Sequence, residues 1–285
     1  KIAKRIEEYC ISQKVINNLT DRCNKLRDNN ITPSLKVILV GNNQASIRYT
    51  NSKQKFCLEI GAKCEIIKLD ESISEEKFSD TINTVVNDQL VHGCLIQLPL
   101  PSHLQKIDLP SIIPPSKDVD GFHYENIGKL FYNQDSLLPC TPKGIITCLK
   151  HYKVPIAGKH IVIIGRSHIV GRPLALMLIN QDATVTICHS KTENLNMITK
   201  TADIIISAIG RANFINKTYL NLDKKQILVD VGINQNTQGK LCGDIDFENV
   251  LPYVSAITPV PGGIGPMTII SLMQNLLQAA EKTYK

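Results

Sequence analysis

Short runs rich in apolar residues recur along the chain, and the segments between them carry apolar residues at helical spacing. We interpret residues 35–40 as a buried strand, and residues 64–69 and 93–97 as a second and a third strand. One helix is predicted to follow the turn at Gly41 and to close at Gly61, and a second to cover 74–87 with Ser74 as its N-cap. This alternation of strand and helix is typical of a parallel sheet with right-handed crossovers.

The same pattern starts again near residue 142. Further strands are predicted over residues 159–164, 184–188, 203–208 and 226–231. Further helices are predicted over residues 1–28, 141–152, 174–180, 192–200 and 269–285. Thr141 is the expected N-cap of its helix, and residues 101–141, rich in Pro and poor in periodicity, are predicted to be mainly loop. We therefore expect an α/β protein of two domains, 1–141 and 142–268.

Composition places the chain among soluble globular proteins. Of its 285 residues, 43% are hydrophobic and 20% are charged, which is enough apolar material for a sizeable core. No apolar run approaches the roughly 18 to 20 residues that cross a bilayer, so we expect no membrane span. The first residues lack the apolar segment of a signal peptide, which favours a cytoplasmic protein. Because the sequence starts at Lys1 without a Met, we expect its first element to be missing.

Charge and cysteine usage exclude little but guide the search. The net charge of +6 comes from scattered Lys and Arg, which suit a local anionic ligand, and no basic block favours a nucleic acid. Nine Cys occur singly, without a Cys-x-x-Cys pair or a paired Cys/His spacing, so we predict no metal site. Cys94 and Cys188 lie in apolar runs and are expected to be buried, reduced thiols.

Three polar residues of the predicted helix after the first strand share one face. Ser46, Tyr49 and Lys53 are three and four residues apart, so a hydroxyl, a phenol and an amine line one stripe at the carboxyl end of a strand. Gln97 ends the third strand just before Pro99 and lies at the same rim. We interpret this rim as a ligand site. The alternatives are that Lys53 is a solvated surface residue and Gln97 a hydrogen-bonded core residue.

Two carboxylates, Asp118 and Asp120, precede Gly121 on the predicted loop. Acidic residues spaced by one residue beside a Gly are typical of an Asx-turn. On a rim loop, Asp120 is equally able to accept two N–H donors from an amidine-like heterocycle. The sequence leaves both interpretations open.

In the second half, a Gly-rich turn from Gly165 to Gly171 directly follows the strand 159–164 and leads into a helix. Backbone N–H groups and the positive end of a helix dipole then meet at one spot, which suits a phosphate. The turn lacks the Gly-x-Gly-x-x-Gly spacing, so as a general dinucleotide signal it is weak.

The charges beside this turn are more informative than its glycines. An NAD site normally has an acidic residue at the end of the next strand, where this chain reads Cys188-His-Ser-Lys191. Arg166 and Ser190 stand at the two strand ends and are able to bind a 2′-phosphate, so we predict NADP rather than NAD. The alternative is that Arg166 and Lys191 are ordinary surface charges.

Residues 258–268 combine three Pro with three Gly. Fixed φ angles and bare backbone suit a loop held against a flat ligand, although such a loop also serves as a plain connector. Small residues at 207–210 and 230–234 end two other strands, where the backbone can approach a cofactor closely.

Together these segments resemble the FolD family of bifunctional methylenetetrahydrofolate dehydrogenases and methenyltetrahydrofolate cyclohydrolases. The matching motifs occur in family order and are Ser46-x-x-Tyr49-x-x-x-Lys53 with Cys57 and Gly61, Gln97-Leu-Pro-Leu-Pro101, Lys117-Asp-Val-Asp-Gly121, Gly165-Arg-Ser-x-Ile-Val-Gly-Arg-Pro173, Cys188-His-Ser-Lys-Thr192, Asp230-Val-Gly-Ile-Asn234, Gly243-Asp-Ile-Asp246 and Pro261-Gly-Gly-Ile-Gly-Pro-Met-Thr268. The chain departs from the family at Thr50 and Ile264, where Val is commoner, and its loop 87–93 is a residue short.

The resemblance implies an N-terminal folate-side domain that faces a C-terminal, Rossmann-like NADP domain across a cleft, with the helix 269–285 packing back on the first domain. It implies that Lys53 is the catalytic amine, Tyr49 stacks on the aminobenzoyl ring, Gln97 holds Lys53 and Asp120 binds the pterin edge. The remaining substrate contacts that it implies are Ser46, Pro261, Gly262 and Gly263.

For the cofactor, the resemblance implies that Arg166 and Ser190 hold the 2′-phosphate of NADP. Gly165, Ser167 and the backbone of Ile233 would surround the rest of the molecule. Family members are typically homodimers that act on one-carbon derivatives of tetrahydrofolate, so a homodimer is expected here too.

The implied chemistry has two steps. Hydride leaves the methylene bridge of 5,10-methylenetetrahydrofolate for NADP, a step that needs alignment more than acid or base. Water then attacks the methenyl cation to give 10-formyltetrahydrofolate, and this step needs proton transfer. Lys53 is suited to it once burial and the positive substrate favour its neutral form.

Three other functions compete with this interpretation. A dehydrogenase without cyclohydrolase activity would not need Lys53, Tyr49 and Gln97 together. Another NADP dehydrogenase, such as a shikimate-type enzyme, would leave the motifs at 97–101 and 117–121 without a role. A non-catalytic nucleotide sensor would bind NADP and turn over no folate.

Overall fold

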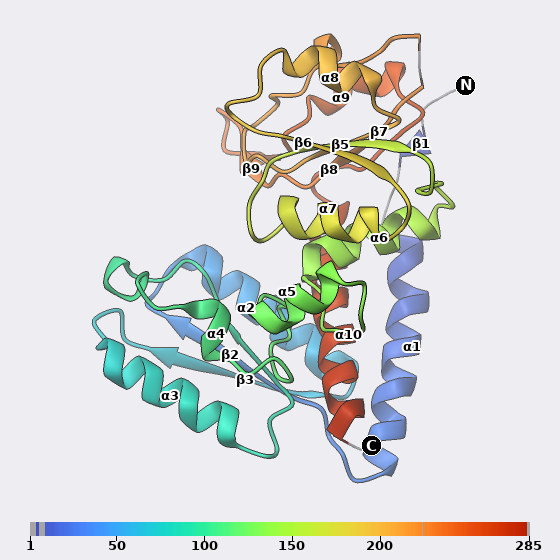
Figure 1. Cartoon of the computed structure of the whole chain (residues 1–285). Helices are drawn as coiled ribbons and strands as arrows, with labels where there is room; N and C mark the ends of the chain where they lie inside the picture. Colours follow the sequence, from blue (N-terminus) through green and yellow to red (C-terminus); the bar gives the residue numbers. More distant parts are fainter. Residues whose placement is uncertain (1–3, 6–8, 224, 284–285) are drawn as a thin grey trace. The chain divides into compact units, whose positions relative to one another are not determined.

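The computed structural model describes residues 4–5, 9–223 and 225–283, and Figure 1 shows the chain coloured along its sequence. It divides into two compact units, of which unit 1 comprises residues 1–13 and 140–268 and unit 2 comprises residues 14–139 and 269–285. The first residues therefore belong with the later half of the chain, and the last residues with the earlier half.

Unit 2 contains a parallel sheet of three strands in the order β3-β2-β4. The strands are β2 (Ser34–Val40), β3 (Lys63–Leu69) and β4 (Gly93–Ile96), and the helices that connect them are α2 (Gln44–Glu59) and α3 (Glu75–Asn87). The predicted strands and helices of this half are confirmed, including Ser74 as the N-cap of α3. Phe78 and Ile82 of α3 are fully buried against Ile38 and Cys94 of the sheet. This packing explains why β4 is buried along its whole length, whereas the edge strand β3 is partly exposed.

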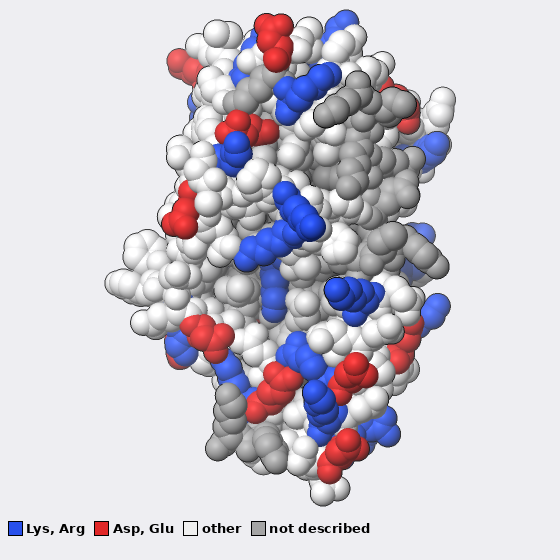
Figure 2. Space-filling view, turned by 90° about the vertical axis from the view of Figure 1, so that its right-hand side faces the viewer, with Lys and Arg blue, Asp and Glu red and all other residues white. Residues whose placement is uncertain are grey.

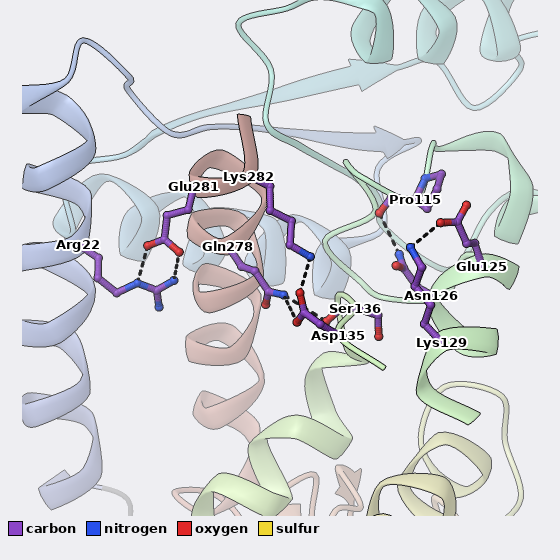
Figure 3. A network of polar contacts seen from close by, with 10 residues as sticks. All are labelled: Arg22, Pro115, Glu125, Asn126, Lys129, Asp135, Ser136, Gln278, Glu281 and Lys282. Carbon is purple, nitrogen blue, oxygen red and sulfur yellow. Dashed lines mark hydrogen bonds and ion pairs between the residues drawn. The ribbon is translucent and has the colours of Figure 1, made fainter. Parts of the chain in front are cut away.

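The rest of unit 2 is helical. It contains most of α1 (Tyr9–Asp28) and α10 (Ile264–Thr283), together with the short helices η1 (Ser102–Leu104), α4 (Leu109–Ile112) and α5 (Tyr124–Phe131). Figure 3 shows how polar contacts tie the end of α10 to its neighbours. Arg22 of α1 donates two hydrogen bonds, of 2.8 and 2.9 Å, to Glu281, and Lys282 lies 2.8 Å from Asp135.

Unit 1 contains a parallel sheet of six strands in the order β1-β11-β8-β7-β5-β6. The strands are β1 (Lys4–Arg5), β5 (His160–Ile164), β6 (Thr184–Cys188), β7 (Ile204–Ser207), β8 (Ile227–Asp230) and β11 (Ala256–Ile257). Its helices are α6 (Cys140–His151), α7 (Gly171–Ile179), α8 (Leu195–Thr201), α9 (Phe247–Val250), η2 (Lys217–Tyr219) and η3 (Leu251–Tyr253), and β9 (Asn234–Gln235) pairs antiparallel with β10 (Leu241–Cys242).

The strand order of unit 1 locates its ligand-binding edge. From β5 the chain moves to β6 on one side, and then returns to add β7 on the other side of β5. The carboxyl ends of β5 and β7 therefore form the switch point at which open parallel sheets bind their ligands. The predicted α/β class with parallel sheets is confirmed.

Three predicted elements are wrong in part. Lys4 and Arg5 form β1 rather than the start of a helix, because two residues that pair with β11 leave no periodic signal; the predicted helix also covers residues 1–3 and 6–8, which lie outside the described residues. The loop predicted over 101–141 contains α5, which His123 caps by accepting a hydrogen bond from the backbone N–H of Glu125. Thr141 lies inside α6 instead of capping it.

The last helix starts earlier than predicted. It begins at Ile264 instead of 269 and so includes part of the Pro- and Gly-rich segment. Pro266 is tolerated there because the first turn of a helix has N–H groups without intrahelical partners. The predicted end at residues 284–285 lies outside the described residues.

Charged side chains of both signs mix on the surface. Figure 2 shows Lys and Arg beside Asp and Glu over the lower part of one face. Ion pairs among the described residues include Arg22–Glu281, Lys36–Glu65, Lys129–Glu125 and Lys282–Asp135. Several basic side chains thus have acidic partners.

Candidate functional site

Helix α2 carries the predicted polar stripe at the carboxyl end of β2. Gly41, with a φ angle of +78°, turns the chain out of the strand, and the Asn43 side chain caps α2 by accepting a hydrogen bond of 3.0 Å from the backbone N–H of Ser46. The three residues of the stripe differ in exposure. Ser46 is buried, Lys53 is half-buried and Tyr49 is 46% exposed, so an aromatic ring stands free beside the amine.

Lys53 and Gln97 contact each other directly. The Lys53 Nζ atom donates a hydrogen bond of 2.9 Å to Gln97 Oε1, and Gln97 Nε2 donates one of 2.9 Å to the carbonyl oxygen of Leu98. The backbone N–H of Gln97 in turn bonds Ile38 of β2. Because both ends of its amide are engaged, Gln97 presents a fixed oxygen to the lysine.

The two neighbouring aspartates divide the roles that the sequence left open. Asp118 is buried and forms the turn: it accepts hydrogen bonds from the backbone N–H groups of Gly121, at 3.1 Å, and His123, at 2.7 Å, and from Asn126 Nδ2, at 3.0 Å. Among the described residues, none donates a hydrogen bond to the Asp120 carboxylate. Asp120 therefore retains its acceptor capacity for a ligand.

Asp120 is also electrostatically distinct. Desolvation raises its pKa to about 6, and the neighbouring Asp118 carboxylate adds to that rise, whereas the Lys53 ammonium opposes it. The structure thus brings Lys53, Gln97 and Asp120 into one polar cluster within unit 2, with a cation, an amide oxygen and a carboxylate at the carboxyl ends of β2 and β4.

The loop that carries Asp120 is held by residues that the sequence analysis did not select. Asn275 of α10 is fully buried, and its Nδ2 donates to the backbone oxygens of Val119, at 2.8 Å, and Leu138, at 2.7 Å. Lys117 donates to two backbone oxygens, those of Val86 and Asp88. An Asn on the apolar face of an amphipathic helix was the available signal for the first of these contacts.

Thr50, a departure from the family pattern, is accommodated without an unpaired group. Its side chain is fully buried, and its Oγ1 donates a hydrogen bond of 3.0 Å to the carbonyl oxygen of Ile47. The hydroxyl is therefore satisfied within α2.

The predicted substrate contacts Pro261, Gly262 and Gly263 belong to unit 1, whereas Lys53 belongs to unit 2. Gly262 has a φ angle of +93°, and a Cβ at position 263 would lie 2.4 Å from the carbonyl oxygen of Pro259. This loop is therefore a tight backbone turn that admits no side chain at 263.

The Gly-rich turn after β5 is equally constrained. Gly165 has a φ angle of +123°, and a Cβ there would lie 2.4 Å from the carbonyl oxygen of Ala208; one at Gly171 would lie 2.1 Å from the carbonyl oxygen of Gly165. Ser167 Oγ accepts a hydrogen bond from the backbone N–H of Val170 and so orders the turn. The bare backbone at the start of α7 fits the pyrophosphate of a dinucleotide.

Arg166 and Ser190 follow the ends of two adjacent strands, β5 and β6, at equivalent positions. Ile164 of β5 pairs with Cys188 of β6, and the backbone N–H of Gly165 donates a hydrogen bond of 2.8 Å to the carbonyl oxygen of Cys188. Arg166 and Ser190, each two residues beyond this pair, are both exposed. Ile233, 52% exposed, follows β8, so all five predicted cofactor residues lie at the carboxyl edge of one sheet.

Two other kinds of feature are absent from the described part of the chain. No helix there is both long and apolar enough to cross a membrane. Nor do the residues that the structure describes contain a group of three or more His, Cys, Asp or Glu side chains placed to hold a metal ion.

Comparison with known proteins assigns the two halves. Residues 6–120 match the catalytic domain of tetrahydrofolate dehydrogenase/cyclohydrolase, and residues 139–284 match the NAD(P)-binding domain of the same enzymes.

Full-length relatives agree. The bifunctional protein FolD of Ligilactobacillus salivarius is 46% identical over 282 residues, which are 99% of this chain and 98% of that protein. The crystal structure of the bifunctional enzyme FolD from Campylobacter jejuni, 44% identical, superposes with a TM-score of 0.95 over 99% of each chain. The enzyme from Trypanosoma brucei, solved in complex with NADP cofactor and an inhibitor, is 29% identical with a TM-score of 0.93 over 100% of this chain and 99% of its own. The chain therefore belongs to the tetrahydrofolate dehydrogenase/cyclohydrolase family, among its bifunctional FolD members.

Proposed function

We propose that this methylenetetrahydrofolate dehydrogenase and methenyltetrahydrofolate cyclohydrolase uses NADP as its hydride acceptor and Lys53 as the proton-transfer group of its hydrolytic step. The substrate is 5,10-methylenetetrahydrofolate, the intermediate is the methenyl cation and the product is 10-formyltetrahydrofolate. Residues 1–141, with the final helix, would bind the folate, and residues 142–268 the cofactor.

The preference for NADP rests on the paired strand ends at Arg166 and Ser190. A guanidinium and a hydroxyl there suit a 2′-phosphate, and the turn over residues 188–192 contains no carboxylate to repel it. The backbone N–H of His189 donates a hydrogen bond of 2.8 Å to Thr192 Oγ1, and this bond orders the turn that contains Ser190. The complex of the Trypanosoma brucei relative with NADP adds support.

The role of Lys53 rests on its contact with Gln97. The amide oxygen, 2.9 Å from Nζ, orients the amine while leaving its remaining positions free for water or substrate. Asp120 would accept the N–H donors of the pterin edge, and the exposed ring of Tyr49 offers a face to the aminobenzoyl group. Ser46 and the 261–263 loop complete the proposed substrate contacts.

The bound nicotinamide supplies the hydride acceptor. The chain's task in that step is to align the substrate, because hydride transfer needs little proton movement. The hydrolytic step is different, since the attacking water must lose a proton, and a positioned amine contributes about 100- to 10,000-fold to such steps.

A paired assay tests both parts. Purified protein is given 5,10-methylenetetrahydrofolate with NADP or NAD, and reduced cofactor and methenyl hydrolysis are followed separately. We expect fast reduction of NADP with decay of the methenyl species. Arg166→Gln should lower kcat/KM for NADP by about tenfold or more and leave NAD unchanged, because one charge-assisted hydrogen bond is lost.

Lys217→Gln, an exposed charge change on η2 in the same unit, is the matched control and should leave both cofactors unaffected. Equal use of NAD and NADP by the wild-type protein would contradict the phosphate assignment. A folded protein without folate turnover would favour the nucleotide-sensor function.

We also propose that the enzyme is a cytoplasmic homodimer. The eight cysteines that the structure describes form no disulfide with one another, which is compatible with a reducing compartment. Light scattering coupled to gel filtration tests the dimer directly, since a mass near 31.6 kDa would mean a monomer.

A further inference from the structure

Two buried carboxylates, Asp230 and Asp244, lie at the carboxyl ends of β7 and β8 in unit 1. Asp244 is fully buried, and Asp230 is 3% exposed. The sequence motifs at 230–234 and 243–246 contain these two acids but give neither of them a role.

Asp244 binds the segments that follow both strands. Its Oδ2 accepts hydrogen bonds from Ser207 Oγ, at 3.2 Å, and from the backbone N–H of Ile209, at 2.8 Å. Its Oδ1 accepts from the backbone N–H of Arg211 and from Asn234 Nδ2, both at 2.9 Å. Four donors from two separate segments thus converge on one carboxylate.

Asp230 binds the returning chain in the same way. Its Oδ1 accepts from the backbone N–H groups of Gly232, at 3.0 Å, and Asp244, at 2.9 Å, and its Oδ2 accepts from that of Ile245, at 2.9 Å. The backbone N–H of Asp230 donates a hydrogen bond of 2.8 Å to Thr258 Oγ1. Because the chain no longer pairs as strands here, these N–H groups need acceptors, and the carboxylates supply them.

Backbone packs tightly against the carboxylates of Asp230 and Asp244. A Cβ at Gly232 would lie 2.1 Å from Asp244 Oδ1, and the three atoms nearest to a Cβ at Gly243, the closest at 1.9 Å, all belong to the Asp230 carboxylate. Ala208 belongs to the segment that Asp244 holds, and its carbonyl oxygen packs closely against Gly165 of the Gly-rich turn after β5. A shift of the carboxylates would therefore be transmitted to the cofactor edge.

We propose that Asp230 and Asp244 are positioning residues for the nicotinamide cofactor, whose carboxylates hold the segments 207–211 and 230–234 in the backbone conformation that cofactor binding requires. The inference rests on the proposed cofactor site, because Ile233 and the Gly165 turn are its neighbours. The carboxylates themselves are buried and need not touch the cofactor.

The bifunctional enzyme provides its own internal comparison, because methenyl hydrolysis needs no nicotinamide cofactor and its proposed proton-transfer group, Lys53, belongs to unit 2. In Asp244→Asn, one carboxylate oxygen becomes an NH2 group that faces N–H donors, so at least one backbone contact is lost. We expect the KM and the Kd for NADP to rise about tenfold. The kcat/KM for methenyl hydrolysis should stay within about twofold, and this selective change is a result that general destabilisation does not produce.

Two further variants guard against misfolding. Ser207→Ala removes only the Ser207 Oγ contact and should raise the KM for NADP by about two- to fivefold. Gly243→Ala displaces the Asp230 carboxylate without removing it and should resemble Asp244→Asn. In an Asp230→Ala background, Gly243→Ala should add little, because the atoms it would clash with are gone.

Asp246→Asn is the matched control. Its carboxylate accepts a hydrogen bond from Asn249 Nδ2 in α9, away from both segments, so NADP binding should be unchanged. Unaltered NADP binding in both Asp244→Asn and Gly243→Ala, or an equal loss of both activities in Ser207→Ala, would overturn the inference while leaving the proposed function intact. Wild-type protein that binds neither NADP nor NAD would overturn both.

Discussion

Asp120 in unit 2 and Asp230 in unit 1 are carboxylates with similar electrostatics and opposite surroundings. Desolvation is the main cause that raises the pKa of each, to about 6 for Asp120 and about 7 for Asp230. Asp230 accepts three backbone N–H groups, whereas none of the described residues donates a hydrogen bond to Asp120. Charged neighbours also differ, since Lys53 acts on Asp120, and Asp244 acts on Asp230.

The comparison shows that a perturbed pKa alone does not mark a ligand site. Structural networks perturb pKa values as strongly as active sites do. The open acceptor capacity of Asp120 fits its proposed role as a substrate-binding group, whereas the acceptor capacity of Asp230 is taken up by the backbone. Asp118 and Asp120 repeat this division within a single turn.

Of the changes that test this comparison, removal of Lys53 should have the largest effect, because it deletes the charged neighbour of Asp120. Lys53→Met should lower methenyl hydrolysis by about 100-fold or more, since proton transfer is lost. Hydride transfer should fall much less, because it depends on alignment. Single-turnover assays of the two steps measure the split.

Lys55→Met is the control for Lys53→Met, because Lys55 is an exposed lysine on the same helix. It should leave both steps unchanged. If Lys53→Met slowed both steps equally, Lys53 would be acting through substrate binding and not through proton transfer.

The next test titrates Asp120. If its ionised carboxylate accepts the pterin N–H groups, kcat/KM for 5,10-methylenetetrahydrofolate should rise between pH 5 and 7 with an apparent pKa of about 6. Asp120→Asn should abolish this rise of kcat/KM with pH and lower kcat/KM at pH 7 by about tenfold, because an amide offers a donor where an acceptor is needed. Asp80→Asn, an exposed change on α3, should retain the rise. If the rise persisted in Asp120→Asn, another group would be responsible for it.

Local patterns in the sequence were enough to locate the stripe on α2 and the strands around it. Ser46, Tyr49 and Lys53 follow helical spacing, and the strand before them, β2, is a mainly apolar run. Gln97 could be placed at the same rim because Pro99 ends the strand. These predictions succeeded because each rested on residues close together in sequence.

Long-range contacts could not be predicted in this way. The two residues of β1 are defined only by their pairing with β11, about 250 positions later, and so carry no local pattern. Asp118 and Asp120 looked equivalent until the N–H donors of Gly121 and His123 were seen to converge on one of them. The Asp230–Asp244 pair depends in the same way on the meeting of three chain segments.

The smallest expected effect concerns the stability that Asp230 lends to unit 1. The pKa of this carboxyl is about 7 in the folded protein and 3.8 as a reference for the unfolded chain. Between these values the folded protein holds a proton that the unfolded chain has released, so the contribution of Asp230 to the free energy of unfolding falls as the pH rises. Asp230→Asn cannot titrate and lacks this dependence.

Thermal unfolding of the two proteins measures the difference. The Tm of the wild-type protein should exceed that of Asp230→Asn most at pH 5, and the gap should narrow towards pH 8. A narrowing of about 2–4 °C corresponds to about 1 kcal/mol for a protein of this size. A gap that widened with pH would mean that the three N–H donors outweigh burial and hold Asp230 ionised. Asp230 would then differ from Asp120 in the sign of its pKa shift as well as in its hydrogen bonds.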